Sequence, residues 1–324
     1  MTASPAPDVE IRHRQVEVNG NELHLVEAGE GPAVILGHGF PELWYSWRHQ
    51  LPALAAAGYH AIAFDQRGYG DSGKPEAIAD YDIVHLSDDL LGILDVVGDD
   101  QGVFVGHDWG TPPVWATAQR APERVKAVVA MSVPLSPRSS GPPIAIFKAI
   151  FGDTFFYILY FQEPGVAEGE LDPQAERFHR GFLYSISGDA PPGSFKVMPA
   201  AGTGLLDCLT FPDELPAWLT EDDLSTYAQT FTKTGYRGGL NFYRNFDRNW
   251  EASAAWDGTL IEAPTLFIAG EKDPVLLMSP PDRMTPLVPG LRQTVIVDGA
   301  GHWVQQERPD EVNRALLTFL ADVF

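Results

Sequence analysis

The chain has 324 residues, 44% of them hydrophobic, and a formal net charge of −22. Length and hydrophobic content are sufficient for a large buried core, and the acidic balance without a basic cluster argues against nucleic acid or an anionic membrane as a partner. The only cysteine, Cys208, cannot form an internal disulfide, which fits a reducing compartment. Residues 1–15 contain no apolar stretch of signal-peptide length, so we expect a cytoplasmic protein.

Strand and helix patterns alternate up to residue 131 and again from about residue 264. Asn19-Gly20 separates two short strand patterns, residues 16–18 and 23–27, and predicts a hairpin. Buried strands are predicted from short apolar runs at 33–37, 61–64, 103–105, 128–131, 265–269 and 294–297. Helices are predicted at 44–57, 83–97, 113–120 and 310–324. The alternation predicts an α/β fold with a mostly parallel, eight-stranded sheet and helices on both faces.

The pattern changes after residue 131, where four prolines precede a long aromatic and helical segment. We expect a helical cap at 135–255, inserted between a first core segment at 1–134 and a second at 256–324. The most apolar stretch, residues 144–161, is interrupted by Lys148, Gly152 and Asp153, so no membrane span is expected. No glycine-rich phosphate loop follows a strand, and no nucleotide cofactor is expected.

Asp108 is the most informative single residue, because it follows the apolar run 103–105 within Gly106-His107-Asp108-Trp109-Gly110. A sharp strand-to-helix turn that exposes a nucleophile needs small residues two positions before and after it, and Gly106 and Gly110 meet this need. An aspartate there indicates attack on an sp3 carbon, since a carboxylate forms an ester that water can hydrolyse. The alternative for an isolated aspartate is a helix N-cap.

Six further motifs accompany the Asp108 turn: His38-Gly39-Phe40-Pro41, Asp65-Gln66-Arg67-Gly68-Tyr69-Gly70, Tyr160-Phe161-Gln162-Glu163-Pro164-Gly165, Tyr243-Arg244-Asn245, Gly270-Glu271-Lys272-Asp273 and Gly299-Ala300-Gly301-His302-Trp303. With these motifs, the chain resembles the α/β-hydrolase superfamily and, within it, the soluble epoxide hydrolases of bacterial type, over nearly its whole length. Taken together, these motifs are highly specific for this family.

The order nucleophile, acid, histidine matches the catalytic triad of this superfamily. His302 follows the last predicted strand in a glycine-rich turn and is the candidate base. Asp273 follows the strand at 265–269 and is the candidate acid, although an aspartate before a proline also suits a turn or a helix cap. The segment Ser132-Val133-Pro134 offers no acid, which argues against the other acid position found in some relatives.

The resemblance also implies roles for residues that no pattern alone assigns. The backbone amides of Phe40 and Trp109 would form an oxyanion hole, and the Phe40–Pro41 peptide bond would be cis. The phenols of Tyr160 and Tyr243 would lie opposite Asp108 and bind the epoxide oxygen. Five further residues are expected to bind substrate: His38, Pro41, His107, Phe156 and Trp303.

The resemblance implies hydrolysis of a small apolar epoxide by water to a vicinal diol, without metal or cofactor, and leaves a homodimer open. One alternative is a haloalkane or haloacid dehalogenase, which would use the same nucleophile, histidine and acid. Trp109 could then donate to a halide, but Phe40 lies where the second halide donor is common. The other alternative is a ligand receptor that keeps the fold without turnover.

Overall fold

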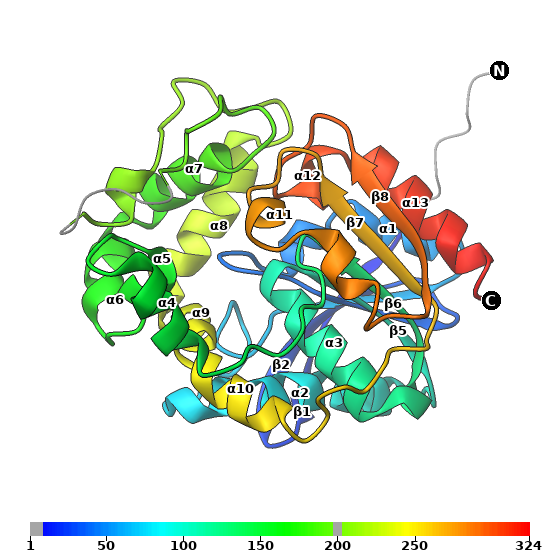
Figure 1. Cartoon of the computed structure of the whole chain (residues 1–324). Helices are drawn as coiled ribbons and strands as arrows, with labels where there is room; N and C mark the ends of the chain where they lie inside the picture. Colours follow the sequence, from blue (N-terminus) through cyan, green and yellow to red (C-terminus); the bar gives the residue numbers. More distant parts are fainter. Residues whose placement is uncertain (1–8, 197–202) are drawn as a thin grey trace.

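The computed structural model describes residues 9–196 and 203–324, which form an eight-stranded sheet flanked by helices (Figure 1). The strand order is β1-β2-β4-β3-β5-β6-β7-β8. The strands are β1 (Ile11–Val18), β2 (Asn21–Ala28), β3 (Ala33–Gly37), β4 (His60–Phe64), β5 (Gly102–His107), β6 (Val125–Met131), β7 (Thr265–Gly270) and β8 (Leu291–Val297). Only the β1–β2 and β2–β4 pairs are antiparallel, which confirms the predicted, mostly parallel sheet.

Most elements lie within three residues of their predicted bounds, and the two that depart further each have a local cause. Strand β1 begins at Ile11 rather than residue 16, because it pairs along its whole length with β2 while most of its side chains stay exposed and show no apolar alternation. The helix predicted at 44–57 is divided into the 3-10 helix η1 (Trp44–Trp47) and α1 (Gln50–Ala56). The Arg48 amide donates to the carbonyl of Tyr45, three residues earlier in the chain. This is the hydrogen bond of a 3-10 helix, and it closes the last turn of η1.

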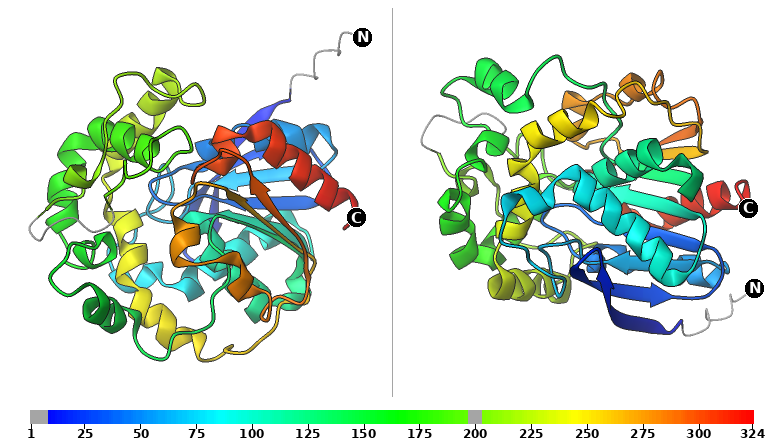
Figure 2. Two further views of the ribbon diagram at one scale, coloured as in Figure 1. Left: turned by 45° about the horizontal axis from the view of Figure 1, so that its top comes forward. Right: turned by 90° about the horizontal axis from the view of Figure 1, so that it is seen from below.

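Helices cover both faces of the sheet, as the alternating pattern predicts (Figure 2). On one face, α1 packs its buried Leu51 and Leu54 beside Leu316 of α13 (Pro309–Ala321), with the short α12 (Val304–Glu307) next to them. On the other face, Leu90 of α2 (Ile83–Val97) and Val114 of α3 (Thr111–Arg120) pack against the strands. The parallel strands therefore end at one common edge, where α/β sheets gather functional side chains.

The predicted cap segment, residues 135–255, supplies seven α-helices between β6 and β7; its residues 197–202, like residues 1–8 of the first core segment, lie outside the described part of the chain. These helices are α4 (Pro143–Phe151), α5 (Tyr157–Tyr160), α6 (Val166–Leu171), α7 (Ala175–Ser185), α8 (Glu221–Thr234), α9 (Arg237–Arg244) and α10 (Phe246–Ser253). They gather on one side of the sheet (Figures 1 and 2). In the described residues, no helix has both the length and the apolar character needed to span a membrane.

The remaining helix, α11 (Val275–Met278), follows β7. Six further 3-10 helices are short connectors: η2 (Ile78–Tyr81), η3 (Asp108–Gly110), η4 (Pro122–Arg124), η5 (Asp172–Gln174), η6 (Leu206–Cys208) and η7 (Pro281–Met284).

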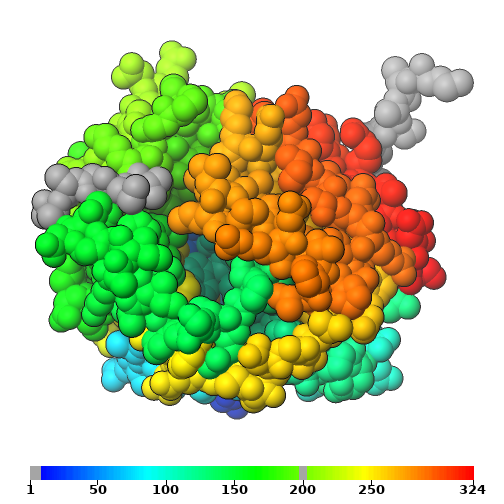
Figure 3. All heavy atoms as spheres, in the orientation of Figure 1, coloured from blue at the N-terminus to red at the C-terminus, as the bar shows by residue number. Residues whose placement is uncertain are grey.

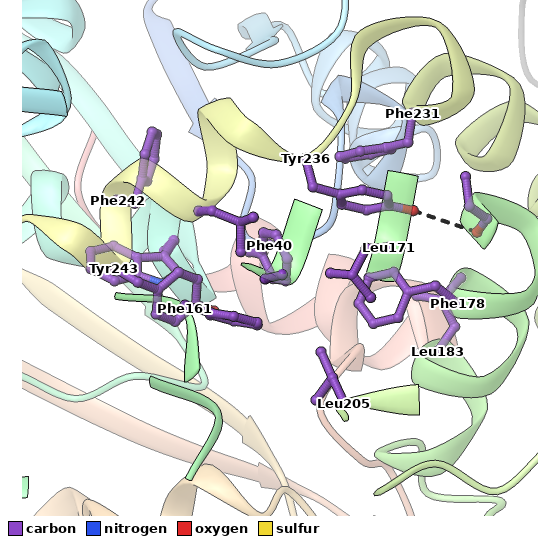
Figure 4. Close-up of a cluster of buried hydrophobic side chains, with 14 of the residues drawn as sticks. Phe40, Phe161, Leu171, Phe178, Leu183, Leu205, Phe231, Tyr236, Phe242 and Tyr243 are labelled. Atoms are coloured by element: carbon purple, nitrogen blue, oxygen red, sulfur yellow. Dashed lines mark hydrogen bonds between the residues drawn. The ribbon is translucent and has the colours of Figure 1, made fainter. Parts of the chain in front are cut away.

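An aromatic cluster joins the cap segment to the sheet edge (Figure 4). The ring of Phe40, from the loop after β3, lies 5.7 Å from Phe161 and 5.4 Å from Tyr243, both in the cap segment. Trp109, at the end of β5, lies 5.7 Å from Phe242 of α9. These are edge-to-face contacts, the arrangement that aromatic quadrupoles favour. The cap segment is thus packed directly on the loops that carry the predicted nucleophile and oxyanion amides.

A buried ion pair holds the loop after β4 to α2. The Arg67 guanidinium binds Asp89 through Nε and Nη2, each 2.6 Å from a carboxylate oxygen, and Nη1 donates to the carbonyl of Asp80. The two side chains of the pair are 4% and 2% exposed. Such a pair is costly to break from one side, because the remaining charge stays buried without a partner.

We therefore expect Asp89→Asn to lower the free energy of unfolding by about 3 kcal/mol. Asp88→Asn is the matched control, because its partner Arg120 is 22% exposed and Asp88 itself 41% exposed, so its loss should be below about 1 kcal/mol. Urea unfolding followed by fluorescence measures both values. Equal losses of unfolding free energy in the two variants would contradict a special role of the buried Arg67–Asp89 pair.

Candidate active site

Asp108 sits in a strained turn between β5 and α3. Its φ is +48°, in the left-handed region that residues other than glycine rarely adopt. A Cβ at position 106 would collide with the backbone of Gly110, and one at position 110 would collide with the carbonyl of Gly37 on the neighbouring strand β3. Both flanking positions therefore require glycine, as the sequence predicts. The close approach projects Asp108 beyond the sheet edge.

The Asp108 carboxylate is bound on two sides. Oδ1 accepts a hydrogen bond from the Phe40 amide at 2.8 Å, and Oδ2 lies 3.5 Å from Nε2 of His302. Burial alone would raise the pKa of Asp108, but the hydrogen bond and charge of His302, the charge of His107 and the Phe40 amide hold it below its ordinary value. Asp108 is thus an ionised carboxylate at neutral pH.

His302 lies between two carboxylates, in the loop after β8. Its Nδ1 is 3.1 Å from both carboxylate oxygens of Asp273, which follows β7. Burial would lower the pKa of His302, yet the charge of Asp273 and hydrogen bonds with Asp108 and Asp273 raise it well above the ordinary value. The structure therefore brings together all three predicted triad residues, with His302 protonated beside an ionised Asp108. The Asp108 side chain is 15% exposed, so it is also the member that a ligand can reach.

Behind the nucleophile lies a fully buried ion pair. His107 Nδ1 is 2.6 Å from Oε2 of Glu42, and its Nε2 is 2.8 Å from the carbonyl oxygen of His302. Burial would raise the pKa of Glu42, but the neighbouring His107 lowers it overall. Since the carboxylate and the carbonyl can only accept, His107 donates from both nitrogens. The pair fixes the backbone of His302 and places positive charge near Asp108.

The structure places three of the expected substrate-binding residues behind the site rather than in it. His38 and Trp303 are completely buried, as is His107. His38 uses both ring nitrogens, one with the Gly39 carbonyl next to it and the other with the backbone amide of Gln66 in the loop after β4. The Trp303 indole donates to the Leu183 carbonyl at 2.8 Å, and its ring packs against His302 at 4.7 Å. These residues support the triad and leave no polar atom for a ligand.

Of the other predicted site residues, some lie as predicted and others do not. The Phe40–Pro41 peptide bond is cis, as predicted, and the Pro41 carbonyl accepts from His179 at 3.2 Å. The Trp109 amide makes no hydrogen bond with the Asp108 carboxylate in the described part of the chain, so only Phe40 of the two predicted oxyanion donors is engaged. Phe156 is 2% exposed and stacks on Phe151 at 3.9 Å, which makes it part of the cap core.

Tyr160 does not face Asp108, contrary to prediction. Its hydroxyl donates to Oε2 of Glu170 at 2.8 Å within the cap segment. Its ring also borders a surface pocket of about 610 Å³ that none of the triad residues lines. Burial and the Glu170 carboxylate are the main causes that raise the pKa of Tyr160.

Tyr157, three residues earlier, takes the position expected of Tyr160. It is partly buried, its ring centroid lies 5.9 Å from that of Tyr243, and both rings contact Phe161. Burial and then the charge of Asp108 raise the pKa values of both Tyr157 and Tyr243. Sequence reasoning missed Tyr157 because the motif it used begins at Tyr160, and a four-residue helix does not reveal from sequence which tyrosine points inward.

The surface is hollowed beside this site. Figure 3 shows an opening between the green segment around α4 and the orange segment of α11, with teal atoms, the colour of α3, at its base. Helix α3 begins three residues after Asp108. Among residues 9–196 and 203–324, no group of three or more His, Cys, Asp or Glu side chains is arranged to hold a metal ion.

Comparisons with known proteins identify the family. Residues 32–156 match the family of the alpha/beta hydrolase fold. The chain is 52% identical to epoxide hydrolase A of Mycobacterium tuberculosis over 95% of this chain and 96% of the relative. The chain belongs to the epoxide hydrolases of the α/β-hydrolase superfamily. A crystal structure of epoxide hydrolase A from Mycobacterium thermoresistibile has a TM-score of 0.93 at 52% identity and covers 96% of this chain and 98% of its own.

Epoxide hydrolases of lower identity are also similar to this chain. One from an endophytic Streptomyces has a TM-score of 0.93 at 44% identity and covers 97% of this chain and 96% of its own. The mouse bifunctional epoxide hydrolase 2 is 41% identical over 98% of this chain and 56% of its own length. The predicted family and fold class are therefore confirmed.

Proposed function

We propose that the chain hydrolyses an epoxide to a vicinal diol in two steps, with Asp108 as nucleophile and His302 with Asp273 as base. The observation that carries this proposal is an ionised carboxylate whose charge acts on two nearby phenols, since a carboxylate can attack an sp3 carbon while phenols donate to the oxygen that leaves it. The pKa shifts that Asp108 causes in Tyr157 and Tyr243 support their closeness to it. The names of the relatives support the same reaction.

The two donors in this proposal are Tyr157 and Tyr243, and Tyr157 replaces Tyr160. The reason is the hydrogen bond from Tyr160 to Glu170, which occupies the phenol in a different part of the cap segment. The Tyr243 ring packs at 5.0 Å from Trp109 beside the nucleophile. With raised pKa values, both phenols keep their protons at neutral pH and are available as donors.

In the first step, Asp108 attacks an epoxide carbon and forms a hydroxyalkyl ester as the carbon–oxygen bond breaks. The departing oxygen is stabilised by the phenols and takes a proton from one of them, and that phenol regains its proton from solvent. The ester no longer carries the charge of Asp108, which is one of the causes that raise the pKa of His302. His302 therefore releases a proton to solvent as the new hydroxyl takes one up, and the proton count is conserved.

In the second step, the neutral His302 takes a proton from water, and the hydroxide attacks the ester carbonyl. The Phe40 amide, already hydrogen bonded to Asp108, is placed to stabilise the oxyanion. On collapse, the leaving diol oxygen takes the proton from His302, and the new carboxylic acid of Asp108 passes its proton to His302, which leaves a protonated His302 beside an ionised Asp108. Asp273 holds the imidazole through Nδ1 during both transfers.

Two other functions were compatible with the same triad. A dehalogenase would need a pair of halide donors, but the Trp109 ring packs against Tyr243, and the Phe40 side chain has no polar atom. A receptor without turnover would not require an ionised nucleophile beside a protonated base. Release of halide would therefore favour the dehalogenase, and ligand binding without product would favour the receptor.

The variant His302→Gln should separate the two steps. Alkylation needs only Asp108 and the phenols, whereas hydrolysis needs the base, so the ester should accumulate. Intact-mass spectrometry after addition of styrene oxide should show one substrate mass added to the protein. In the parent enzyme, the ester should accumulate as pH falls, because His302 then stays protonated in the ester form, whereas the lowered pKa of Asp108 keeps alkylation active. Normal turnover by the variant would rule out His302 as base.

Phe substitutions at the two neighbouring tyrosines test which one is the donor. Tyr157→Phe should slow alkylation by about 100-fold, because one of two donors to the developing alkoxide is lost. Tyr160→Phe is the matched control and should leave alkylation unchanged, since its hydroxyl binds Glu170. Rapid-quench measurement of ester formation gives both rates. A slow Tyr160 variant beside a normal Tyr157 variant would restore the original prediction.

A further inference from the structure

Glu307, at the end of α12, is a buried carboxylate that the two-step mechanism does not use. It is 4% exposed and, within the described residues, no cation pairs with it. Oε2 accepts from the amides of Gly188 at 2.8 Å and Gly301 at 2.9 Å, and Oε1 accepts from the Trp303 amide at 3.0 Å. A buried charge that is balanced only by amides is costly to maintain.

The three amides belong to two loops that are distant in sequence. Gly301 and Trp303 flank His302, whereas Gly188 lies in the cap segment, after α7. We call residues 186–188 the cap loop. The same cap loop also touches His302 directly, because the His302 amide donates to the Ile186 carbonyl at 2.9 Å. Glu307 thus bridges the cap loop and both neighbours of the proposed base.

Two further observations show how tightly the cap loop is held. Lys272, next to Asp273, donates from Nζ to the Gly188 carbonyl at 2.8 Å. A Cβ at Gly188 would collide with the carbonyl of Gly299, and one at Gly301 would collide with the Gly188 amide, so the two backbones are in direct contact. The cap loop therefore rests on the loops of both His302 and Asp273.

We propose that Glu307 is a positioning residue for the hydrolytic step, which fixes His302 between Asp273 and Asp108 by tying its flanking amides to the cap loop. This inference rests on the proposed role of His302 as base. Tyr157 and Tyr243 lie on other cap helices with contacts of their own, such as that of Gln162 Nε2 with the Tyr243 carbonyl at 3.0 Å. Loss of Glu307 should therefore slow ester hydrolysis and spare alkylation.

The direct test is Glu307→Gln, with the two rates measured separately by rapid quench with styrene oxide. Glutamine has one acceptor oxygen, so it cannot serve amides on both sides of the carboxylate position. We expect ester hydrolysis to slow by about tenfold or more, while alkylation changes by less than about twofold, because small displacements of a catalytic group cost large factors in rate. Ester should then accumulate during turnover.

Glu271→Gln is the matched control, because the exposed Glu271 carboxylate accepts from the Gly299 amide of the same loop at 3.1 Å without touching the cap segment. Both of its rates should equal those of the parent. Equal slowing of both steps in Glu307→Gln, or an unchanged hydrolysis rate, would overturn the inference while the proposed function stands. Failure of His302→Gln to accumulate ester would overturn both.

Lys272→Met provides a second test if Glu307→Gln does not fold. The Lys272 side chain holds the cap loop from the other side, and its removal leaves Glu307 and His302 intact. Hydrolysis should slow by about threefold with alkylation unchanged, since the loop keeps its other contacts. A parental hydrolysis rate in this variant would count against the role of the cap loop.

Discussion

The negative charge on Asp108 is the interaction on which the rest of the site depends. It is held at the sheet edge by the Phe40 amide and by His302, and it raises the pKa values of His302, Tyr157 and Tyr243. In the proposed mechanism, ester formation removes this charge, so all three pKa values fall together. The phenols become better proton donors as an alkoxide forms, and His302 becomes the base that the second step requires.

The fold supplies the close packing that this charge needs. Strands β3, β5, β7 and β8 end at one edge and carry, in that order, Phe40, Asp108, Asp273 and His302 on the loops that follow. The buried pair of Glu42 and His107 lies beneath them. In the proposed mechanism, the cap segment supplies the two phenols that act with this nucleophile. The proposed contact of Glu307 with residues 186–188 would make the position of the base depend on the docking of the cap segment.

Much of this arrangement was predictable, because the triad is encoded by short local patterns. Gly106 and Gly110 mark the turn, and Asp273 and His302 each follow an apolar strand. Tyr157 was not predictable from spacing, since its inward direction depends on the partner that Tyr160 finds in Glu170, ten residues away. His38, His107 and Trp303 were expected to bind substrate, but their burial depends on packing between distant loops. Glu307 shows no sequence signal, because its partners are backbone amides.

The central claim is that Asp108 forms a covalent ester. A single turnover with excess enzyme in water labelled with heavy oxygen tests it most directly, because water attacks the ester carbonyl rather than the epoxide. The account predicts that the label enters the Asp108 carboxylate, detected by mass spectrometry of the peptide that contains it, and that the first diol carries none. Label in that first diol, with an unlabelled Asp108, would show direct attack by water and contradict the account.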